Sequence, residues 1–132
     1  MSTPVTHEKL QAALKTRADI RQAILFGSLA NGAQQPDSDI DIALDLGRPI
    51  SAKEKLDLME EIAALTGRSV DLVDLQTVGE PLLGQILKTG KRLLGTNTLY
   101  AELIKRHVFD EADFMPYYRR ILKHRRDAWI GK

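Results

Sequence analysis

Alternating apolar and polar positions mark the strands of this chain. From Asp39 to Leu44, an isoleucine or leucine occupies every second position, the period of two that is typical of a half-buried strand. Successive side chains of a strand point to opposite faces, so Asp39 and Asp41 share one face while the large aliphatic residues enter a core. Further strands are predicted at residues 23–26, 69–75 and 91–94.

Segments with helical spacing separate these strands. Residues 7–16 are predicted to form a first helix with one apolar face. Ser51 and Glu54 have the spacing of a capping box, in which the two side chains satisfy free backbone N–H groups at the start of a helix. We expect this second helix to end at Gly67. Its apolar face is predicted from the helical spacing of Leu56, Met59, Ile62, Ala63 and Thr66.

The rest of the chain is predicted to be mainly helical. Pro81 is tolerated in the first turn of a short helix that we expect to end at Gly90. From Thr96 onward a longer helix is expected, which Pro116 breaks or kinks. The buried side of that helix is predicted to consist of Leu99, Leu103 and Ile104.

The order of these elements predicts an α/β (α+β) fold, a mixed β-sheet with helices packed mainly on one face. A doubly wound parallel sheet is less favoured, because its phosphate site would follow a G-x-G-x-x-G turn that the sequence lacks. A length of 132 residues predicts one domain over residues 1–132, with a core at about residues 20–95 and a C-terminal helical segment at about 96–132.

Composition narrows the functional classes. A hydrophobic fraction of 43% is typical of a globular protein. No segment approaches the roughly 20 apolar residues of a membrane span, and the N-terminus lacks the layout of a signal peptide, so we expect no membrane partner. The absence of cysteine excludes disulfides and thiolate metal sites and suits a cytoplasmic location. The formal charge of +1 gives no reason to expect direct nucleic-acid binding.

The charges are unevenly distributed. Residues 36–46 contain four aspartates and no basic residue, whereas residues 116–132 contain a single acid, Asp127, and six basic residues. A cluster of like charges is unfavourable unless something neutralises it, and a bound cation would do so. We therefore expect a metal ion at the acidic segment and an acidic or phosphate-bearing surface at the basic one. The basic residues are Arg119, Arg120, Lys123, Arg125, Arg126 and Lys132.

A predicted glycine–serine turn precedes the acidic strand. Gly27 and Ser28 end the predicted strand at residues 23–26, and ten residues separate them from Asp39. A glycine lets the backbone approach a phosphate closely, and a helix start offers it free N–H groups. Paired carboxylates suit hard divalent ions that keep open positions for phosphate and water. A phosphate cradle beside a carboxylate pair indicates phosphoryl or nucleotidyl transfer.

The pattern Gly27-Ser28-x10-Asp39-x-Asp41 resembles the signature of the polymerase-β-like nucleotidyltransferases. The short chain resembles their minimal subgroup, the MNT antitoxins of type VII-like HEPN–MNT toxin-antitoxin systems, and the resemblance covers about residues 20–95. It implies ATP as substrate, two Mg²⁺ ions bound by Asp39, Asp41 and a third carboxylate, and phosphate binding by Gly27 and Ser28. It also implies a protein partner, the cognate HEPN ribonuclease toxin, as the acceptor of AMP on a tyrosine.

The third carboxylate has two candidates. The family places it on a neighbouring strand between hydrophobic residues, and both Asp71 and Asp74 have such neighbours. Three positions separate them, so in one straight strand they point to opposite faces and only one can join Asp39 and Asp41. We favour Asp71, because Asp74 lies near the turn that follows the strand.

The resemblance is incomplete at the phosphate site. The family often has basic residues where this chain has Leu29 and Asn31, so two phosphate contacts are missing. Arg48 and the pair Lys53 and Lys55 are possible replacements, although the interpretation as surface charges is favoured. His107 and His124 lack the spacing of metal ligands and are interpreted as surface residues.

The C-terminal segment has two interpretations. Residues 116–132 combine basic residues with Tyr117, Tyr118 and Trp129, and arginine and aromatic residues are enriched at protein interfaces. The segment is either a docking surface for the protein partner or a helix that closes the core.

Three functions remain in competition. The first is an Mg²⁺-dependent protein adenylyltransferase that transfers AMP to the toxin and neutralises it. The second is a non-catalytic antitoxin that acts by binding and occlusion, which the complete set of Ser28, Asp39, Asp41 and Asp71 argues against. The third is a small-molecule nucleotidyltransferase, which would need a further domain to build its acceptor pocket.

Overall fold

The computed structural model describes residues 2–27 and 39–110. Its centre is a four-stranded sheet with the strand order β3-β2-β1-β4. The strands are β1 (Gln22–Phe26), β2 (Ile40–Asp45), β3 (Val70–Asp74) and β4 (Lys91–Leu94). The four predicted strands are therefore confirmed, with β1 beginning one residue earlier than expected.

The sheet is mixed, as the sequence predicts. β1 pairs antiparallel with both β2 and β4, whereas β2 and β3 run parallel. A parallel connection needs a crossover of a dozen or more residues. Helix α2 (Ala52–Thr66) supplies that crossover between β2 and β3.

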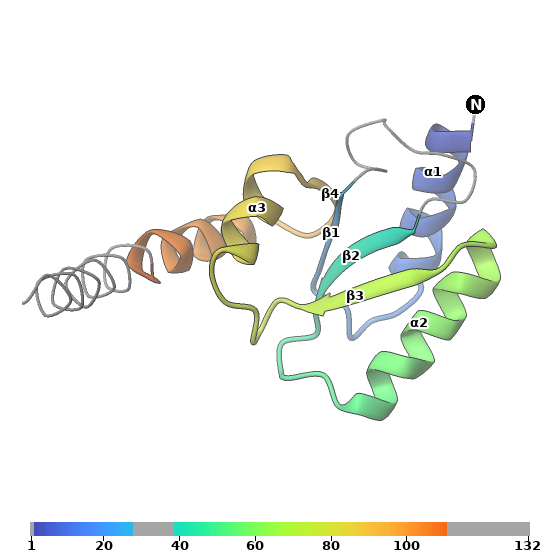
Figure 1. Ribbon diagram of the computed structural model, residues 1–132, viewed down its shortest axis with the longest axis horizontal. Coiled ribbons are helices and arrows are strands. Elements are labelled where there is room, and N and C mark those ends of the chain that lie inside the picture. Colours follow the sequence, from blue (N-terminus) through green and yellow to red (C-terminus); the bar gives the residue numbers. More distant parts are fainter. Residues whose placement is uncertain (1, 28–38, 111–132) are drawn as a thin grey trace, which may run out of the picture.

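Two long helices cover one face of the sheet (Figure 1). Helix α1 (Ser2–Lys15) contributes Leu10 and Leu14, and α2 contributes Leu58 and Ile62. These side chains pack against the aliphatic residues that β2 and its neighbours direct to this face, which are Ala23, Leu25, Ile40, Ile42, Leu44, Val70, Leu72 and Leu93. Burial of such a cluster is the main stabilising contribution of the fold.

Helix α2 begins and ends as its sequence predicts. The Ser51 side chain accepts a hydrogen bond from the Glu54 N–H group, and the Glu54 carboxylate accepts one from the Ser51 N–H group. Gly67 closes the helix in a left-handed conformation, with φ 71°. The predicted apolar face was wrong at Leu56, which is 56% exposed, because the helix turns Leu58 toward the sheet instead.

The other face of the sheet is partly covered by α3 (Leu82–Thr89) and a helix at residues 97–110 (Figure 1). Leu83, Ile86 and Leu103 pack there against Ile24 and Ala43 of the central strands. The predicted fold class, an α/β (α+β) fold with a mixed β-sheet, is confirmed.

The first turns of the helix at residues 97–110 contact α3 and β4. The Tyr100 hydroxyl donates to the Leu87 carbonyl at 3.1 Å, and the Arg92 guanidinium lies over the Tyr100 ring. The prediction that Leu103 is buried is confirmed, and Leu99 is half-buried. The prediction that Ile104 is buried was wrong, since this side chain is 42% exposed.

Some predictions fall outside the described residues. Ser28, Leu29, Asn31, Pro116 and the basic segment at residues 116–132 are among them. The single-domain boundaries therefore stay a prediction. Within residues 2–27 and 39–110, none of the helices has the length and apolar character needed to cross a membrane.

Candidate active site

The predicted carboxylates meet at one end of the central strands. Asp41 on β2 and Asp71 on β3 are register partners in the parallel ladder. Register partners project to the same face, so these carboxylates are neighbours on the face opposite the α1 and α2 helices. Asp39 precedes Ile40 by one residue and is exposed, directly beside this pair. The structure therefore brings Asp39, Asp41 and Asp71 together.

Gly27 lies next to this cluster. It follows β1 directly, and Phe26, the residue before it, is the register partner of Asp41. Gly27 has φ 77°, a left-handed conformation that favours glycine. A Cβ atom at this position would collide with Oδ2 of Asp41. Glycine is therefore required both by the backbone conformation and by the close approach of the carboxylate.

The electrostatics of the cluster are unfavourable in the absence of a cation. Burial raises the pKa of Asp41 above its ordinary value of 3.8, and the negative charges of Asp71 and Asp39 raise it further. Within the described part of the chain, these three carboxylates make no hydrogen bond or ion pair. Carboxylates that repel one another without internal partners indicate a site that receives a positive charge from outside.

Asp74 has a different environment from Asp71. It pairs in register with Leu44 and points to the face that carries α2. One of its carboxylate oxygens accepts a hydrogen bond from the Ile50 N–H group at 2.8 Å, and the other accepts one from the Gln76 N–H group at 2.9 Å. Asp74 thus holds the loop before α2 and the turn after β3, away from the cluster.

The donor chemistry of the cluster fits a hard divalent cation, because all three side chains offer carboxylate oxygens. The described residues do not form a finished metal cage: across 2–27 and 39–110, no three His, Cys, Asp or Glu side chains are grouped so that they hold an ion by themselves. Mg²⁺ commonly takes only one or two protein carboxylates and completes its shell with water and substrate phosphates. Such an incomplete donor set is consistent with an ion that arrives with a nucleotide.

The basic residues near α2 are engaged elsewhere. Both guanidinium nitrogens at the end of the Arg48 side chain contact the Glu54 carboxylate, at 2.8 and 2.6 Å. This pairing lowers the pKa of Glu54 to about 2. Lys53 lies 3.6 Å from Asp57 of the next helical turn. The interpretation of these residues as surface charges agrees with their partners.

His107 differs from its interpretation as a surface residue. Its Nδ1 atom lies 2.9 Å from Oε2 of Glu80, and the two side chains are only 28% and 11% exposed. The pair connects the helix at residues 97–110 to the segment before α3. Its partner lies in another element, so periodicity along the helix could not reveal this contact.

The sequence analysis also missed a buried polar pair. It lies at the end of the β1–β2 hairpin that is remote from Gly27. Gln22 and Asp45 are register partners there, and they are 1% and 5% exposed. The predicted strand began at Ala23 and left Gln22 out. A glutamine directly before an apolar strand run was the available signal.

Comparisons with known proteins agree with this geometry. The polymerase beta nucleotidyltransferase family matches residues 8–115. Over 72 residues the chain is 38% identical to the protein adenylyltransferase MntA of Shewanella oneidensis, covering 54% of this chain and 52% of that protein. Over 60 residues it is 38% identical to the protein adenylyltransferase MntA of Thermococcus cleftensis, covering 46% of this chain and 61% of that protein. The match thus spans about half to three fifths of these curated relatives.

A solved structure extends the similarity to the whole fold. A chain in the crystal structure of a toxin-antitoxin with AMP-PNP superposes with a TM-score of 0.72 at 26% identity, covering 88% of this chain and 98% of that chain. The converging carboxylates, the similar overall fold and the family match over residues 8–115 have one explanation. This chain belongs to the polymerase beta nucleotidyltransferase family.

Proposed function

We propose that this protein is an antitoxin with protein adenylyltransferase activity. It transfers AMP from ATP to a tyrosine hydroxyl of a cognate HEPN ribonuclease toxin, releases pyrophosphate and thereby neutralises the toxin. The observation that carries the proposal is the register of Asp41 with Asp71, beside Gly27, where a Cβ atom would collide with the Asp41 carboxylate. The names of the two adenylyltransferase relatives and the toxin-antitoxin crystal structure support the choice of reaction and partner.

The reaction exchanges a phosphoanhydride bond of ATP for a phosphoester bond to the acceptor. The oxygen of the acceptor hydroxyl forms a bond to the α-phosphorus of ATP, and the bond from that phosphorus to the bridging oxygen of the β-phosphate breaks. Pyrophosphate leaves with that oxygen. The hydroxyl proton passes to Asp71 or, through it, to water, because Asp71 is the exposed member of the register pair.

The chain itself contributes position and charge. Gly27 offers a backbone without a side chain at the end of β1, where a phosphate can approach closely. Ser28 follows directly in sequence, and we assign it to the terminal phosphates. Asp39 and Asp41 are fixed by β2, whose core side chains hold the strand rigidly under the cluster. Such positioning accounts for a large share of enzymatic rate enhancement.

We further propose that Asp39, Asp41 and Asp71 bind two Mg²⁺ ions. When bound, these ions neutralise the phosphates and polarise the attacking and leaving oxygens. The raised pKa of Asp41 supports this assignment, because a cation removes the repulsion from Asp71 and Asp39.

A cytoplasmic location, expected from the sequence, stays a prediction.

Mass spectrometry of the partner tests the proposal. The protein is incubated with ATP, Mg²⁺ and the purified toxin from the neighbouring reading frame, and the intact mass of the toxin is measured. We expect the toxin to gain one or more AMP units and to lose ribonuclease activity. Inhibition of the toxin without any change of its mass would show occlusion instead and would refute the enzymatic proposal.

The acceptor class is tested in the same reaction. Peptide mapping of the modified toxin is expected to locate AMP on a tyrosine. Replacement of that tyrosine by phenylalanine removes only the attacking oxygen and should abolish the mass gain. A mass gain that persists in the phenylalanine variant would contradict the assigned acceptor.

A further inference from the structure

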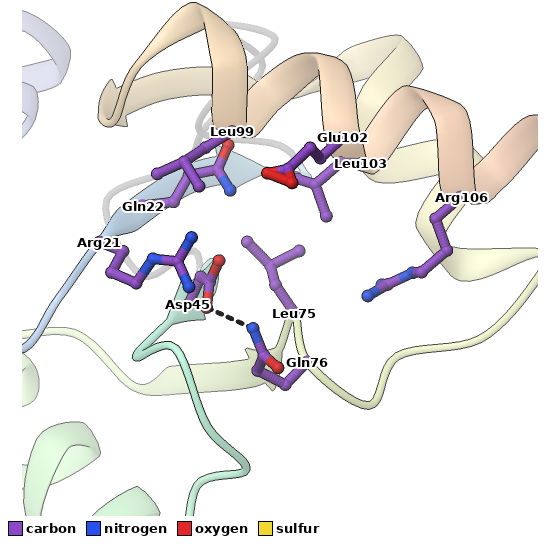
Figure 2. Close-up of a pocket in the computed structure, with 9 residues that line it drawn as sticks. All are labelled: Arg21, Gln22, Asp45, Leu75, Gln76, Leu99, Glu102, Leu103 and Arg106. Carbon is purple, nitrogen blue, oxygen red and sulfur yellow. Dashed lines mark hydrogen bonds between the residues drawn. The ribbon is translucent and has the colours of Figure 1, made fainter.

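A cavity of about 220 Å³ lies at the end of the β1–β2 hairpin that is remote from Gly27 and Asp41 (Figure 2). Gln22 and Asp45 line it from the two strands, and the helix at residues 97–110 covers it with Leu99 and Leu103. Between this cavity and the carboxylate cluster, α3 and that helix pack on Ile24 and Ala43. The two sites therefore share one face of the sheet but are separated by core packing.

The Gln22 side chain is the most informative group in this cavity. It is 1% exposed, and neither its Oε1 nor its Nε2 atom has a hydrogen-bond partner. A buried amide without partners costs on the order of 1–3 kcal/mol per unmet group. Figure 2 shows this amide among the side chains that surround the cavity. The two amide atoms are closed off from the cavity in this side-chain position, and rotation of the amide would bring them to its wall. There, a ligand that accepts and donates a hydrogen bond side by side would satisfy both atoms, and a carboxamide has this arrangement.

The helix at residues 97–110 contributes opposite charges to the lining of the cavity, Glu102 and Arg106. Arg106 directs its guanidinium toward the space between the strands and the helix in Figure 2, and its buried Nε atom also lacks a partner. Its Nη2 atom makes only a long hydrogen bond, 3.4 Å, to the Val78 carbonyl. Glu102 precedes Arg106 by one helical turn, a spacing at which opposite charges commonly pair. In the described structure these two side chains form no ion pair with each other.

We propose that this cavity is a second, non-catalytic binding site for a small zwitterion with a carboxamide end, the chemistry of free glutamine or asparagine. The ligand carboxamide pairs with the Gln22 amide. Its carboxylate binds the Arg106 guanidinium, and its ammonium group binds the Glu102 carboxylate. Leu99 and Leu103 contact the methylene carbons between the two ends.

The size and charge of the cavity agree with this ligand. Its volume lies below the roughly 300–1,000 Å³ of sites for larger organic ligands and suits a molecule of about ten heavy atoms. Arg21 and Arg106 balance Asp45 and Glu102 on its walls, so the lining favours a molecule with both charges over a simple anion. Asp45 is buried and accepts hydrogen bonds from Gly47 and Gln76 through Oδ1, whereas Glu102 is exposed, so we assign Glu102 as the partner for the ammonium group.

An NMR titration of the full chain with L-glutamine tests the proposal. We expect saturable shifts of the amide resonances of Gln22, Leu99 and Leu103 at millimolar ligand. Two probes separate the contributions: L-norleucine is a zwitterion without the carboxamide, and propionamide is a carboxamide without the zwitterion. Both should bind at least about tenfold more weakly, the equivalent of one lost hydrogen-bonded pair.

Two variants locate the binding. Gln22→Met keeps the length of the side chain and removes an amide without hydrogen-bond partners, so it should raise the melting temperature while weakening L-glutamine binding about tenfold. Arg106→Met should weaken it comparably and serves if Gln22→Met fails to fold. Gln85→Met, on an exposed position of α3, is the matched control and should bind as the wild type does.

The test is independent of adenylyl transfer. A protein with Asp39→Ala and Asp41→Ala should bind L-glutamine as tightly as the wild type, whether or not it transfers AMP. The absence of saturable shifts with L-glutamine would overturn the proposal. So would equal binding of L-norleucine, or unchanged L-glutamine affinity in both Gln22→Met and Arg106→Met.

Discussion

Asp41 and Asp45 lie on the same face of β2, at opposite ends of the same hairpin, yet their surroundings differ. Asp45 is 5% exposed and accepts hydrogen bonds from the Gly47 N–H group and the Gln76 amide, both at 2.8 Å. Asp41 has no hydrogen bond within the described residues, and burial together with the charges of Asp71 and Asp39 raises its pKa. The carboxylate at one end of the hairpin therefore has hydrogen-bond donors, whereas the described residues offer none to the carboxylates at the other end.

This difference separates structural from functional acids. A buried carboxylate with two donors stabilises the turn that supplies them, because hydrogen bonds to charged groups contribute more than neutral ones. Carboxylates that face one another without donors destabilise the fold and are retained for a bound cation or substrate. Asp45 and Asp74 belong to the first kind, and Asp39, Asp41 and Asp71 to the second.

The largest expected effect is on catalysis by the carboxylate cluster. Replacing Asp39 and Asp41 together by alanine should reduce AMP transfer to the toxin by on the order of 10³-fold, since charge stabilisation by bound metal contributes several kcal/mol. The melting temperature should not fall, because neither side chain makes a hydrogen bond within residues 2–27 and 39–110. Transfer at the wild-type rate in this variant would remove the carboxylate pair from the mechanism.

The contrast between Asp71 and Asp74 sharpens the comparison. Asp71→Asn should lower the transfer rate by about 10²-fold, as expected for loss of a metal ligand or base, and leave stability unchanged. Asp74→Asn should lower the free energy of unfolding by about 1–3 kcal/mol, because its oxygens accept from Ile50 and Gln76. Its transfer rate per folded molecule should change little. The opposite ranking of transfer rates would make Asp74 the third carboxylate.

Gly27 can be tested against a matched glycine. Gly27→Ala and Gly67→Ala both place an L-residue at a left-handed position, with φ 77° and 71°, and each should cost about 1–2 kcal/mol of stability. Only the Cβ atom at Gly27 collides with Asp41, whereas no atom lies within 4 Å at Gly67. Gly27→Ala should therefore also slow transfer by about tenfold through displacement of Asp41. Equal transfer rates in the two variants would show that the contact has no catalytic role.

The smallest expected effect is on the stability of the metal-free protein. The folded state raises the pKa of Asp41, so it binds the proton more tightly than the unfolded state does. The contribution of Asp41 to stability therefore declines as the pH rises from the ordinary pKa of 3.8 through the raised one, and it stays unfavourable at neutral pH.

Asp41→Asn should abolish that decline and melt at a slightly higher temperature than the wild type at neutral pH. Thermal melts over an acid-to-neutral series measure this, with Glu60→Gln, an exposed position on α2, as the control. A wild-type pH profile retained in Asp41→Asn would assign the decline to another group.

The local parts of this account could be predicted from the sequence. Strand alternation placed Asp39 and Asp41 on one face, and the capping box of Ser51 and Glu54 located the start of α2. Strand parity also placed Asp71 and Asp74 on opposite faces. The register of β3 against β2 decides which of them meets Asp41, and parallel register depends on the crossover helix and the core, which lie outside the strand sequence.

The wrong prediction for α2 arose because two apolar stripes overlap along this helix. The apolar residues of α2 include both Leu56 and Leu58, so two stripes compete along this helix, and the packing of α2 against the sheet selected Leu58 and Ile62. Likewise, the pairing of His107 with Glu80 and the cavity lined by both Gln22 and Arg106 involve residues distant in sequence. Periodicity along one element carries no information about such contacts.

The position of the metal ion is the most direct test of the central claim, because both ends of the hairpin carry acids. Mn²⁺ accepts the same oxygen ligands as Mg²⁺ and broadens the NMR signals of nearby nuclei. Substoichiometric Mn²⁺ with an ATP analogue should broaden the amide resonances of Gly27, Asp41 and Asp71 first. It should leave those of Asp45 and Asp74 sharp, and Asp39→Asn with Asp41→Asn should remove the effect. Broadening centred on Asp45 or Asp74, or broadening unchanged in the double variant, would contradict the account.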